Sequence, residues 1–317
     1  MTDSLDPTER AAIALRGVSK HYGAVRAVDG VDLDVGYGEV FGLIGHNGAG
    51  KSTLFKMMLG LIPVSAGDIC VAGASVRARA FRAARRQIGY LPENLVLYDN
   101  LSGLETLRFF ARLKGAPLAD CEALLARVGL ASAGGKPVRA YSKGMRQRLG
   151  FAQALLGTPR VLFLDEPTNG LDPAAIHDFY AMLQTLREQG VTILITSHIL
   201  AELQQRIDRL AILADGRILA LGSVAALREQ ADLPLTLALR VEAGTRAAFW
   251  QQLAPLRAQG IEIEDGHADQ DMTLRCRRAL KMHALAALQP LGGRLLDLQI
   301  HEPSLEDVFF GLREVAA

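Results

Sequence analysis

Short runs of hydrophobic residues, broken by glycine and aspartate, occupy the first part of the chain and predict strands joined by tight turns. Further along, two continuous apolar runs are of the kind that a parallel sheet buries on both faces. Asp215-Gly216, between two more apolar segments, is a hairpin signal. The predicted strands are Ile13–Leu15, Val25–Val28, Val31–Val35, Val40–Ile44, Val161–Leu164, Val191–Thr196, Leu210–Leu213 and Arg217–Leu221.

Apolar residues at helical spacing occur between these strands. One helix is expected to begin at Ser52, soon after the strand that ends at Ile44, and to run to about Gly60. Because strands alternate with helices, the pattern implies an α/β sheet with right-handed crossovers. The other helices are expected near residues 103–114, 118–128, 144–156 and 174–189.

The pattern changes after about residue 230, where short strands and helices alternate at closer spacing. We therefore divide the chain into residues 10–231, an α/β domain, and residues 232–317, a small α+β domain. The second domain is expected to hold strands at 235–241, 261–264, 272–276 and 294–300, and helices at 245–258, 279–288 and 304–314.

Composition narrows the class of protein. The 317 residues are 50% hydrophobic and 22% charged, which excludes a disordered tail, a collagen-like fibre and a disulfide-stapled miniprotein. The net charge of +1 argues against a dedicated nucleic-acid binder. Three scattered cysteines indicate reduced thiols and a cytosolic protein. The N-terminus does not resemble a secretory signal, and no apolar run reaches the roughly 18–20 residues that span a bilayer, so a partner chain would supply any membrane part.

The strongest chemical signal is a glycine-rich motif between a strand and a helix, which fits G-x-x-x-x-G-K-[ST]. Its glycines let backbone N–H groups wrap phosphates, and the helix N-terminus adds a positive dipole. Lys51 is expected to reach the β- and γ-phosphates, Ser52 to ligate Mg²⁺ and Thr53 to touch the α-phosphate. An ordinary glycine-rich turn is the alternative. The motif comprises Gly45, His46, Asn47, Gly48, Ala49, Gly50, Lys51, Ser52 and Thr53.

Two carboxylates follow the apolar run Val161–Leu164, at the strand end where ligands bind in open α/β sheets. Asp165 suits Mg²⁺, directly or through water, and Glu166 suits a general base that polarises an attacking water. A charge pair at the start of a helix is the structural alternative. Together with the glycine-rich motif, the pair predicts a nucleotide hydrolase.

Tyr141-Ser142-Lys143-Gly144-Met145-Arg146-Gln147-Arg148 resembles the signature segment of ATP-binding-cassette (ABC) ATPases, and the likeness covers nearly all of residues 10–230. The resemblance implies a P-loop fold with a parallel core sheet, an antiparallel β subdomain and a helical subdomain. It also implies a homodimer in which Ser142 and Gly144 face the γ-phosphate bound by the opposite subunit. By position in the motifs it implies adenine stacking for Tyr22, a Q-loop at Gly89–Glu93, a D-loop at Gly170–Pro173 and a catalytic switch histidine at His198.

Each of these residues also has a structural interpretation. Tyr22 could be a surface aromatic residue, His198 could cap a turn, and Ser142 could be only a helix N-cap. Glu93 stands where the family has glutamine. A carboxylate there can still ligate Mg²⁺, but it brings negative charge near the phosphates. His46 is a conceivable lone metal ligand, although a loop side chain near the nucleotide is the simpler interpretation.

Two segments are candidates for contact with a membrane partner. Asn94–Tyr98 and the helix near 103–114 resemble the surface on which this family docks the permease's cytoplasmic helix, unless their apolar side chains fold back into the core. Arg77–Arg86 holds five arginines in ten residues and is a solvated face, a site for acidic lipid headgroups, or a site for acidic loops of a partner.

The sequences of these motifs resemble, more narrowly, those of the ATPase of nitrous-oxide-reductase maturation systems. Such systems work with a permease and a periplasmic accessory protein in copper-site assembly. Exporters of drugs or lipids of the ABC-2 type share these motifs and an ending like Pro303–Phe309, so they are the alternative. A non-transport ABC ATPase and a non-hydrolysing ATP binder are more remote alternatives. In either transport case, ATP and Mg²⁺ are expected as cofactors. The protein itself is expected on the inner face of the cell membrane.

Overall fold

The computed structural model describes residues 11–197, 203–204, 206–265, 271–308 and 311. Its contacts divide the chain into two compact units, Met1–Leu221 and Gly222–Ala317. The boundary lies ten residues before the expected 231/232, because helix α8 (Val224–Ala231) belongs to the second unit. Leu227 of α8 is buried, and Arg228 donates to the carbonyl of Pro303 and pairs with Glu302. No helix of the described residues is long and apolar enough to cross a membrane.

The first unit is built on a six-stranded sheet in the order β10-β9-β3-β8-β7-β6. Strands β3, β7 and β8 are buried at every residue, as the continuous apolar runs predict. Parallel pairing brings Ile44 level with Ser197, and Asp165 level with Thr196, so the carboxyl ends of these strands share one edge. The strands are β3 (Val40–Ile44), β6 (Ile88–Leu91), β7 (Val161–Asp165), β8 (Thr192–Ser197), β9 (Arg209–Ala214) and β10 (Arg217–Gly222).

A second, antiparallel sheet has the order β2-β1-β4-β5. The two strands predicted at 25–28 and 31–35 are one strand, because Gly30 takes a positive φ and lets the chain continue through a bulge. Strands β4, β5 and β6 were not predicted, since their runs are short and carry polar residues. The strands are β1 (Ala11–Tyr22), β2 (Val25–Gly36), β4 (Ala66–Val71) and β5 (Ala74–Ser75).

Helix α1 (Lys51–Met58) packs between the two sheets. Phe55 meets Phe163 of β7 edge-to-face at 5.4 Å, and Leu54, Met57 and Met58 are fully buried in the same cluster. This packing fixes the start of α1, and with it the glycine-rich loop, against the edge of the six-stranded sheet.

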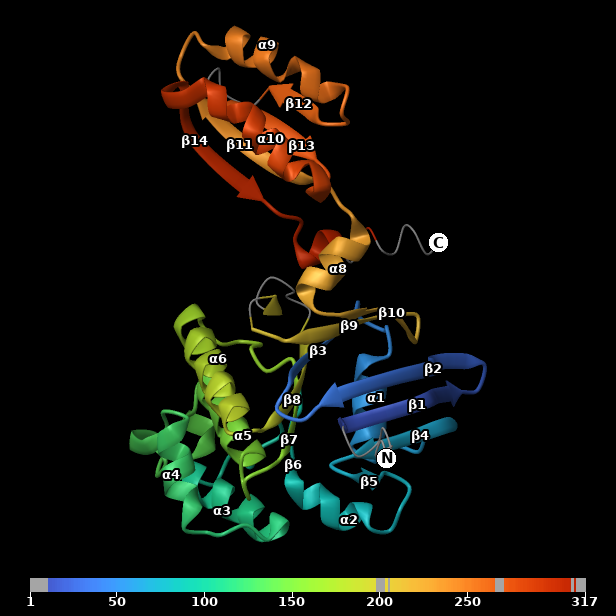
Figure 1. Ribbon diagram of the computed structural model, residues 1–317. Helices are drawn as coiled ribbons and strands as arrows, with labels where there is room; N and C mark the ends of the chain where they lie inside the picture. Colours follow the sequence, from blue (N-terminus) through green and yellow to red (C-terminus); the bar gives the residue numbers. More distant parts are fainter. Residues whose placement is uncertain (1–10, 198–202, 205, 266–270, 309–310, 312–317) are drawn as a thin grey trace, which may run out of the picture. The chain divides into compact units, whose positions relative to one another are not determined.

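Helices α3, α4, α5 and α6 lie on the opposite side of β6, β7 and β8 from the antiparallel sheet, whereas α2 lies beside β5 and packs Phe81 and Ala84 into the same core as α1 (Figure 1). Ser102 and Glu105 form a capping box at the start of α3, and Asp172 followed by Pro173 caps α6. The helices are α2 (Phe81–Ala84), α3 (Gly103–Lys114), α4 (Asp120–Arg127), α5 (Lys143–Ala154) and α6 (Pro173–Glu188).

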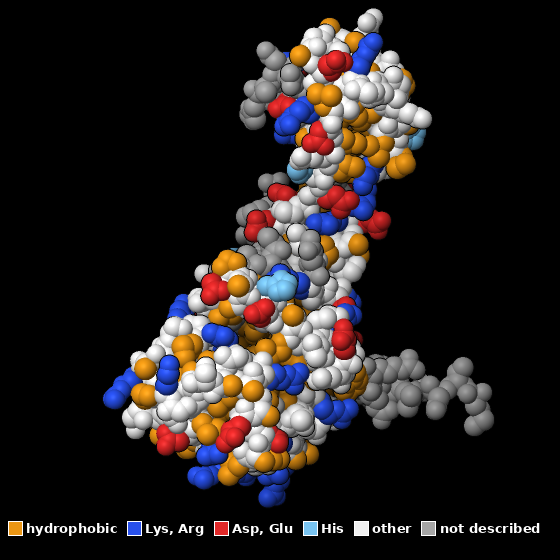
Figure 2. Space-filling model, turned by 90° about the vertical axis from the view of Figure 1, so that its left-hand side faces the viewer, with side chains coloured by type: hydrophobic (Ala, Val, Ile, Leu, Met, Phe, Trp, Pro, Cys, Tyr) orange, Lys and Arg blue, Asp and Glu red, His pale blue; other side chains and the backbone are white. Residues whose placement is uncertain are grey.

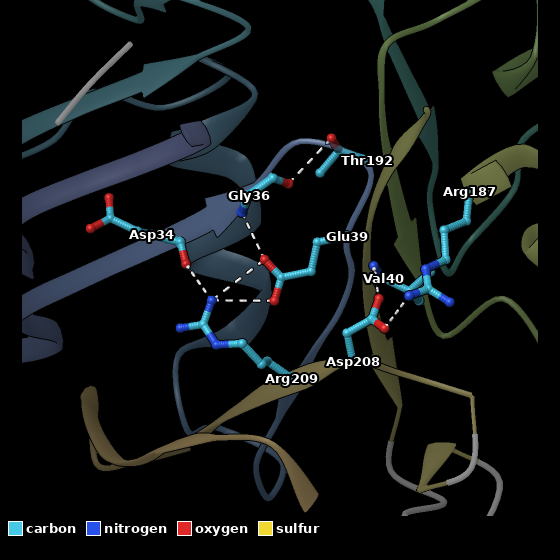
Figure 3. Close-up of polar contacts among 8 residues, drawn as sticks. All are labelled: Asp34, Gly36, Glu39, Val40, Arg187, Thr192, Asp208 and Arg209. Atoms are coloured by element: carbon cyan, nitrogen blue, oxygen red, sulfur yellow. Dashed lines mark hydrogen bonds and ion pairs between the residues drawn. The ribbon is translucent and has the colours of Figure 1, made fainter. Parts of the chain in front are cut away.

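A polar cluster joins the two sheets at the edge opposite the carboxyl ends (Figure 3). The carboxylate of Glu39 accepts from the Gly36 N–H at 2.7 Å and from Arg209, which also reaches the carbonyl of Asp34. Asp208 accepts from the Val40 N–H at 2.9 Å and from the Arg187 guanidinium. These charge-assisted bonds hold β2, β3, β9 and α6 in one register.

The second unit adds an antiparallel sheet in the order β12-β13-β11-β14 with two helices on one face. The chain order is β-α-β-β-α-β, a split βαβ arrangement. Its core includes Leu237, Phe249, Leu253 and Leu274, all fully buried, which confirms the expected α+β class. The elements are β11 (Leu235–Val241), α9 (Arg246–Arg257), β12 (Glu262–Asp265), β13 (Asp271–Cys276), α10 (Lys281–Leu288) and β14 (Leu295–His301).

Candidate nucleotide-binding site

The glycine-rich loop runs from β3 into α1 and depends on its glycines. Gly48 and Gly50 take φ values of 86° and 106°, which other residues rarely adopt. A Cβ on Gly50 would stand 2.4 Å from the carbonyl oxygen of Ala27, and one on Gly45 would stand 2.4 Å from that of Leu213. The loop is therefore held closely between β9 and β2, with its backbone N–H groups at the start of α1.

Lys51 is the first residue of α1, directly after this loop, and is buried, with 8% of its surface exposed. Its Nζ donates to the carbonyl of Gly45 at 2.5 Å and to that of His46 at 3.2 Å. Burial lowers the pKa of Lys51, while the charges of Glu166, Asp165 and Glu93 act in the opposite direction. Ser52, the next residue, is exposed, and Thr53 is half-buried.

Asp165 and Glu166 lie at the end of β7, each with 7% of its surface exposed. Asp165 Oδ1 accepts from the Thr196 hydroxyl at 2.7 Å, and the Glu166 N–H donates to the same hydroxyl oxygen at 3.0 Å. Glu166 has a φ of 49°, a left-handed conformation that costs energy for a residue with a side chain. Thr196 thus holds both residues in place, a role that the sequence analysis did not assign to it.

Burial and the neighbouring groups act on the pKa of Asp165, some raising it and others lowering it. Burial raises the pKa of Asp165 and the Thr196 hydrogen bond opposes this; the charge of Glu93 raises the pKa further, and Lys51 and Lys56 lower it. Because burial and a like charge disfavour the carboxylate, a bound cation would restore it. Among the described residues no group of three or more His, Cys, Asp or Glu side chains forms a metal cluster.

Glu93 is exposed and follows β6, at the same edge of the sheet. Its charge acts on Lys51, on Asp165 and on Tyr90, and burial together with Asp165 and Glu93 raises the pKa of Tyr90 to about 12. The structure thus brings Glu93 into the electrostatic field of the loop lysine and the strand-end carboxylate, as its place after β6 suggests.

The Ser142–Gly144 segment lies at the N-terminus of α5. Ser142 is the N-cap of α5, and its hydroxyl accepts from the Met145 N–H at 3.2 Å. A Cβ on Gly144 would meet the Leu171 side chain at 3.6 Å. Buried Gln147 donates to the carbonyl of Pro167 at 2.9 Å, so α5 is tied to the segment that follows Glu166.

The other predicted residues that the structure describes differ in how far they are exposed. Tyr22 ends β1 and is 51% exposed, with Lys20 Nζ 5.1 Å from its ring centre. His46 Nδ1 is 2.7 Å from the carbonyl oxygen of Asn47, and its Nε2 is 3.9 Å from Asp215. These are the contacts of a loop side chain. Asn47 is exposed and Ala49 is buried. His198 lies outside the described residues.

The predicted partner surface is partly exposed. Val96 and Tyr98 are 86% and 55% exposed, and Tyr98 packs edge-to-face on Phe109 of α3. Leu95 and Leu97 are half-buried, and Leu95 packs close to Gly150 of α5. The segment therefore combines the two interpretations, because Leu95 and Leu97 are half-buried whereas Val96 and Tyr98 are exposed.

Comparisons with known proteins agree with this geometry. The family described as ABC transporter matches residues 28–169. An uncharacterized ABC transporter ATP-binding protein of Bacillus subtilis is 36% identical, with 95% of each chain covered. A daunorubicin resistance ATP-binding protein of Streptomyces coeruleorubidus is 37% identical, again with 95% of each chain covered. A solved structure described as the ATP binding subunit of an ABC transporter superposes with a TM-score of 0.65 and 35% identity, covering 69% of this chain and 93% of that one.

Proposed function

The chain belongs to the ATP-binding proteins of ABC transporters and is an ATPase, and on this premise we propose that it couples Mg-ATP hydrolysis to a membrane permease. The observation that carries this proposal is that Lys51, at the start of α1, lies within the electrostatic influence of Asp165 and Glu166 at the end of β7, beside the glycine-rich loop. This arrangement supplies cations and N–H donors for phosphates, and carboxylates for a metal and for water.

In the proposed site Lys51 and the loop N–H groups bind the phosphates, and Tyr22 stacks on the adenine. The Ser52 hydroxyl and the Asp165 carboxylate, with Glu93 beside them, offer the oxygen ligands that Mg²⁺ prefers. When bound, Mg²⁺ would neutralise phosphate charge. Glu166 acts as the general base that orients the attacking water, because its backbone is pinned through Thr196 while its carboxylate follows the strand end. His198 completes the proposed site.

We infer that a second copy of the chain completes each site. Ser142 caps α5 by accepting from the Met145 N–H, and Gly144 follows in the first turn of α5. The charged groups that act on Lys51 are Glu166, Asp165 and Glu93, none of which belongs to this segment. A helix N-terminus favours an anion, and a head-to-tail homodimer would present it to the γ-phosphate bound by the partner. Loss of that phosphate on hydrolysis would remove the bridge and let the dimer open.

The proposed permease contact is the surface of Val96, Tyr98 and α3. Val96 is an apolar residue that is almost fully exposed, and the ring of Tyr98 packs on Phe109 of α3. A short apolar helix of a permease would bury both side chains. This contact would hold the protein on the inner face of the cell membrane.

For the cargo, the full-length likeness to a drug-resistance ATP-binding protein favours an exporter of the ABC-2 type. The second candidate is nitrous-oxide-reductase maturation, which rests on the resemblance of the local motifs. Purification of the tagged chain from gently solubilised membranes, with mass spectrometry of bound proteins, separates the two. A permease alone supports the exporter, and a permease with a periplasmic accessory protein supports maturation.

The proposal is tested with Glu166→Gln. We expect turnover to fall by a factor of 100 or more, because a positioned general base contributes about 10²–10⁴-fold. We also expect ATP to trap a dimer detectable by size-exclusion chromatography. Glu188→Gln, at the end of α6, is the matched control and should retain wild-type turnover. Wild-type turnover in Glu166→Gln would overturn the role given to Glu166.

A further inference from the structure

A strongly basic hollow lies away from the nucleotide site, where α2 and the turn Arg85–Gln87 approach the end of α3. Its volume is about 560 Å³. Four arginines and a lysine line it, together with Ala83 and Leu113: Arg79, Arg82, Arg85, Arg86 and Lys114. Lys and Arg side chains gather at the lower edge of the face in Figure 2, the end at which α2 and α3 lie in Figure 1.

The charges of this hollow are unbalanced. Its lining contains no carboxylate. Within the described part of the chain, Arg79, Arg82, Arg86 and Lys114 make no ion pair within 4.0 Å, whereas nearby Arg77 is 3.8 Å from Asp68. Several arginines elsewhere in the first unit pair with acids, among them Arg16, Arg187 and Arg209.

Two members of the hollow are held in place. Arg85 donates to the carbonyl of Gly60 at 2.7 Å and lies over the Phe81 ring at 5.3 Å. Lys114 ends α3 and is partly buried, and burial lowers the pKa of Lys114 to about 8. A lysine whose charge is disfavoured by burial regains that charge beside an anion.

The geometry points to a binding site for the phosphate headgroups of an anionic lipid surface. Guanidinium forks match phosphate oxygens, and several cations around one concavity suit a headgroup better than a flat surface would. Leu113, in the lining, is 70% exposed, and an apolar side chain among cations is typical of segments at a lipid interface. Nucleic acid is disfavoured, because no aromatic residue lines the hollow to stack on a base.

The test is flotation of the full chain with vesicles of phosphatidylcholine alone, or of equal parts phosphatidylcholine and phosphatidylglycerol. We expect binding only to the second kind. Arg82→Gln with Arg86→Gln should weaken it about tenfold, since basic residues near an anionic surface each add to binding. Arg82→Lys with Arg86→Lys should restore most of it. Neither pair touches the nucleotide site, so ATP turnover without vesicles should stay unchanged and shows that the variants fold.

The matched control is Arg112→Gln with Arg139→Gln, which removes the same charge from exposed arginines outside the hollow. Equal weakening by both pairs would overturn the proposal in favour of diffuse attraction. Binding to phosphatidylcholine alone would overturn it as well. Displacement from vesicles by inorganic phosphate, or by an acidic peptide, at concentrations that leave salt-matched controls bound, would assign the hollow to those anions and not to lipid.

Discussion

The six-stranded sheet and the sheet of the second unit place their charged side chains in different environments. In the six-stranded sheet, Asp165 and Glu166 are buried, share the hydroxyl of Thr196 and lie beside Lys51. In the sheet of the second unit, Arg240 pairs with Asp271 and Arg275 with Glu264 on exposed positions. Buried, interacting charges at a strand end are typical of functional sites, whereas exposed cross-strand pairs add modestly to the stability of a sheet.

The contrast has its origin in how each sheet is covered. Strands β3, β7 and β8 are buried on both faces, so polar groups can lie only at their ends. Strand β11 alternates buried and less buried residues, with helices over one face only. The predicted site of the first unit therefore lies at a strand edge, where the buried strands end.

The largest effect is expected from Asp165→Asn, which should separate stability from activity. Turnover should fall by orders of magnitude, because a carboxylate is lost from the phosphate site. The nucleotide-free protein should melt about 2 °C higher. Burial raises the pKa of Asp165, so its charge is a folding penalty at neutral pH that the amide lacks.

The folding stability of the protein should also depend on pH through Asp165. Because the folded protein holds this proton more tightly than the unfolded chain, Asp165 makes stability fall as pH rises from the ordinary aspartate range through the raised pKa. Thermal melts of wild type and Asp165→Asn across this range should diverge as pH increases. A gap that narrows with rising pH would contradict the assigned penalty.

The next effect is expected from Thr196→Val, which removes the hydroxyl while keeping the size of the side chain. The Glu166 N–H and Asp165 both lose a partner, and an unsatisfied buried group costs about 1–3 kcal/mol. We expect turnover to fall about 10–100-fold, with melting at lower temperature. Thr196→Ser keeps the hydroxyl and should recover turnover; equal loss in both variants would point to packing instead.

A smaller effect is expected from Glu93→Gln, because Glu93 is exposed and its field is screened by solvent. Removing this charge near the phosphates should lower the ATP concentration at half-maximal turnover by about threefold, a change of less than 1 kcal/mol. Glu122→Gln, exposed on α4, is the charge-matched control. Weaker ATP binding in Glu93→Gln would show that the carboxylate serves mainly as a metal ligand.

The smallest effect is expected from Glu264→Gln with Arg275→Gln, on the exposed sheet of the second unit. Their atoms lie 3.6 Å apart with about half of each side chain exposed, and such pairs are typically worth about 0.2–1 kcal/mol. We expect a change in unfolding free energy below 0.5 kcal/mol and unchanged turnover. A large loss of turnover would mean that this face has a role, and would end the contrast drawn above.

Much of the fold followed from local pattern. The strands at 161–164 and 235–241 and the helix at 103–114 were found within a residue or two, because long apolar runs and capping signals are local. Strands β4, β5 and β6 were not, since their stability comes from neighbours: Ile69 and Val71 are buried against β1, and Gly89 fits where the carbonyl of Ala154 leaves no room for a Cβ.

The sequence by itself determined the chemistry of the site: a glycine loop that ends in Lys51, and two carboxylates after a buried strand. Both are short motifs whose residues are neighbours along the chain. Only the tertiary structure decided that Thr196, thirty-one residues from Asp165, binds both carboxylate residues, and that Lys114 lines one hollow together with the arginines of α2 and the turn that follows it. Such contacts depend on strand register and helix packing, which bring together residues that no local pattern connects.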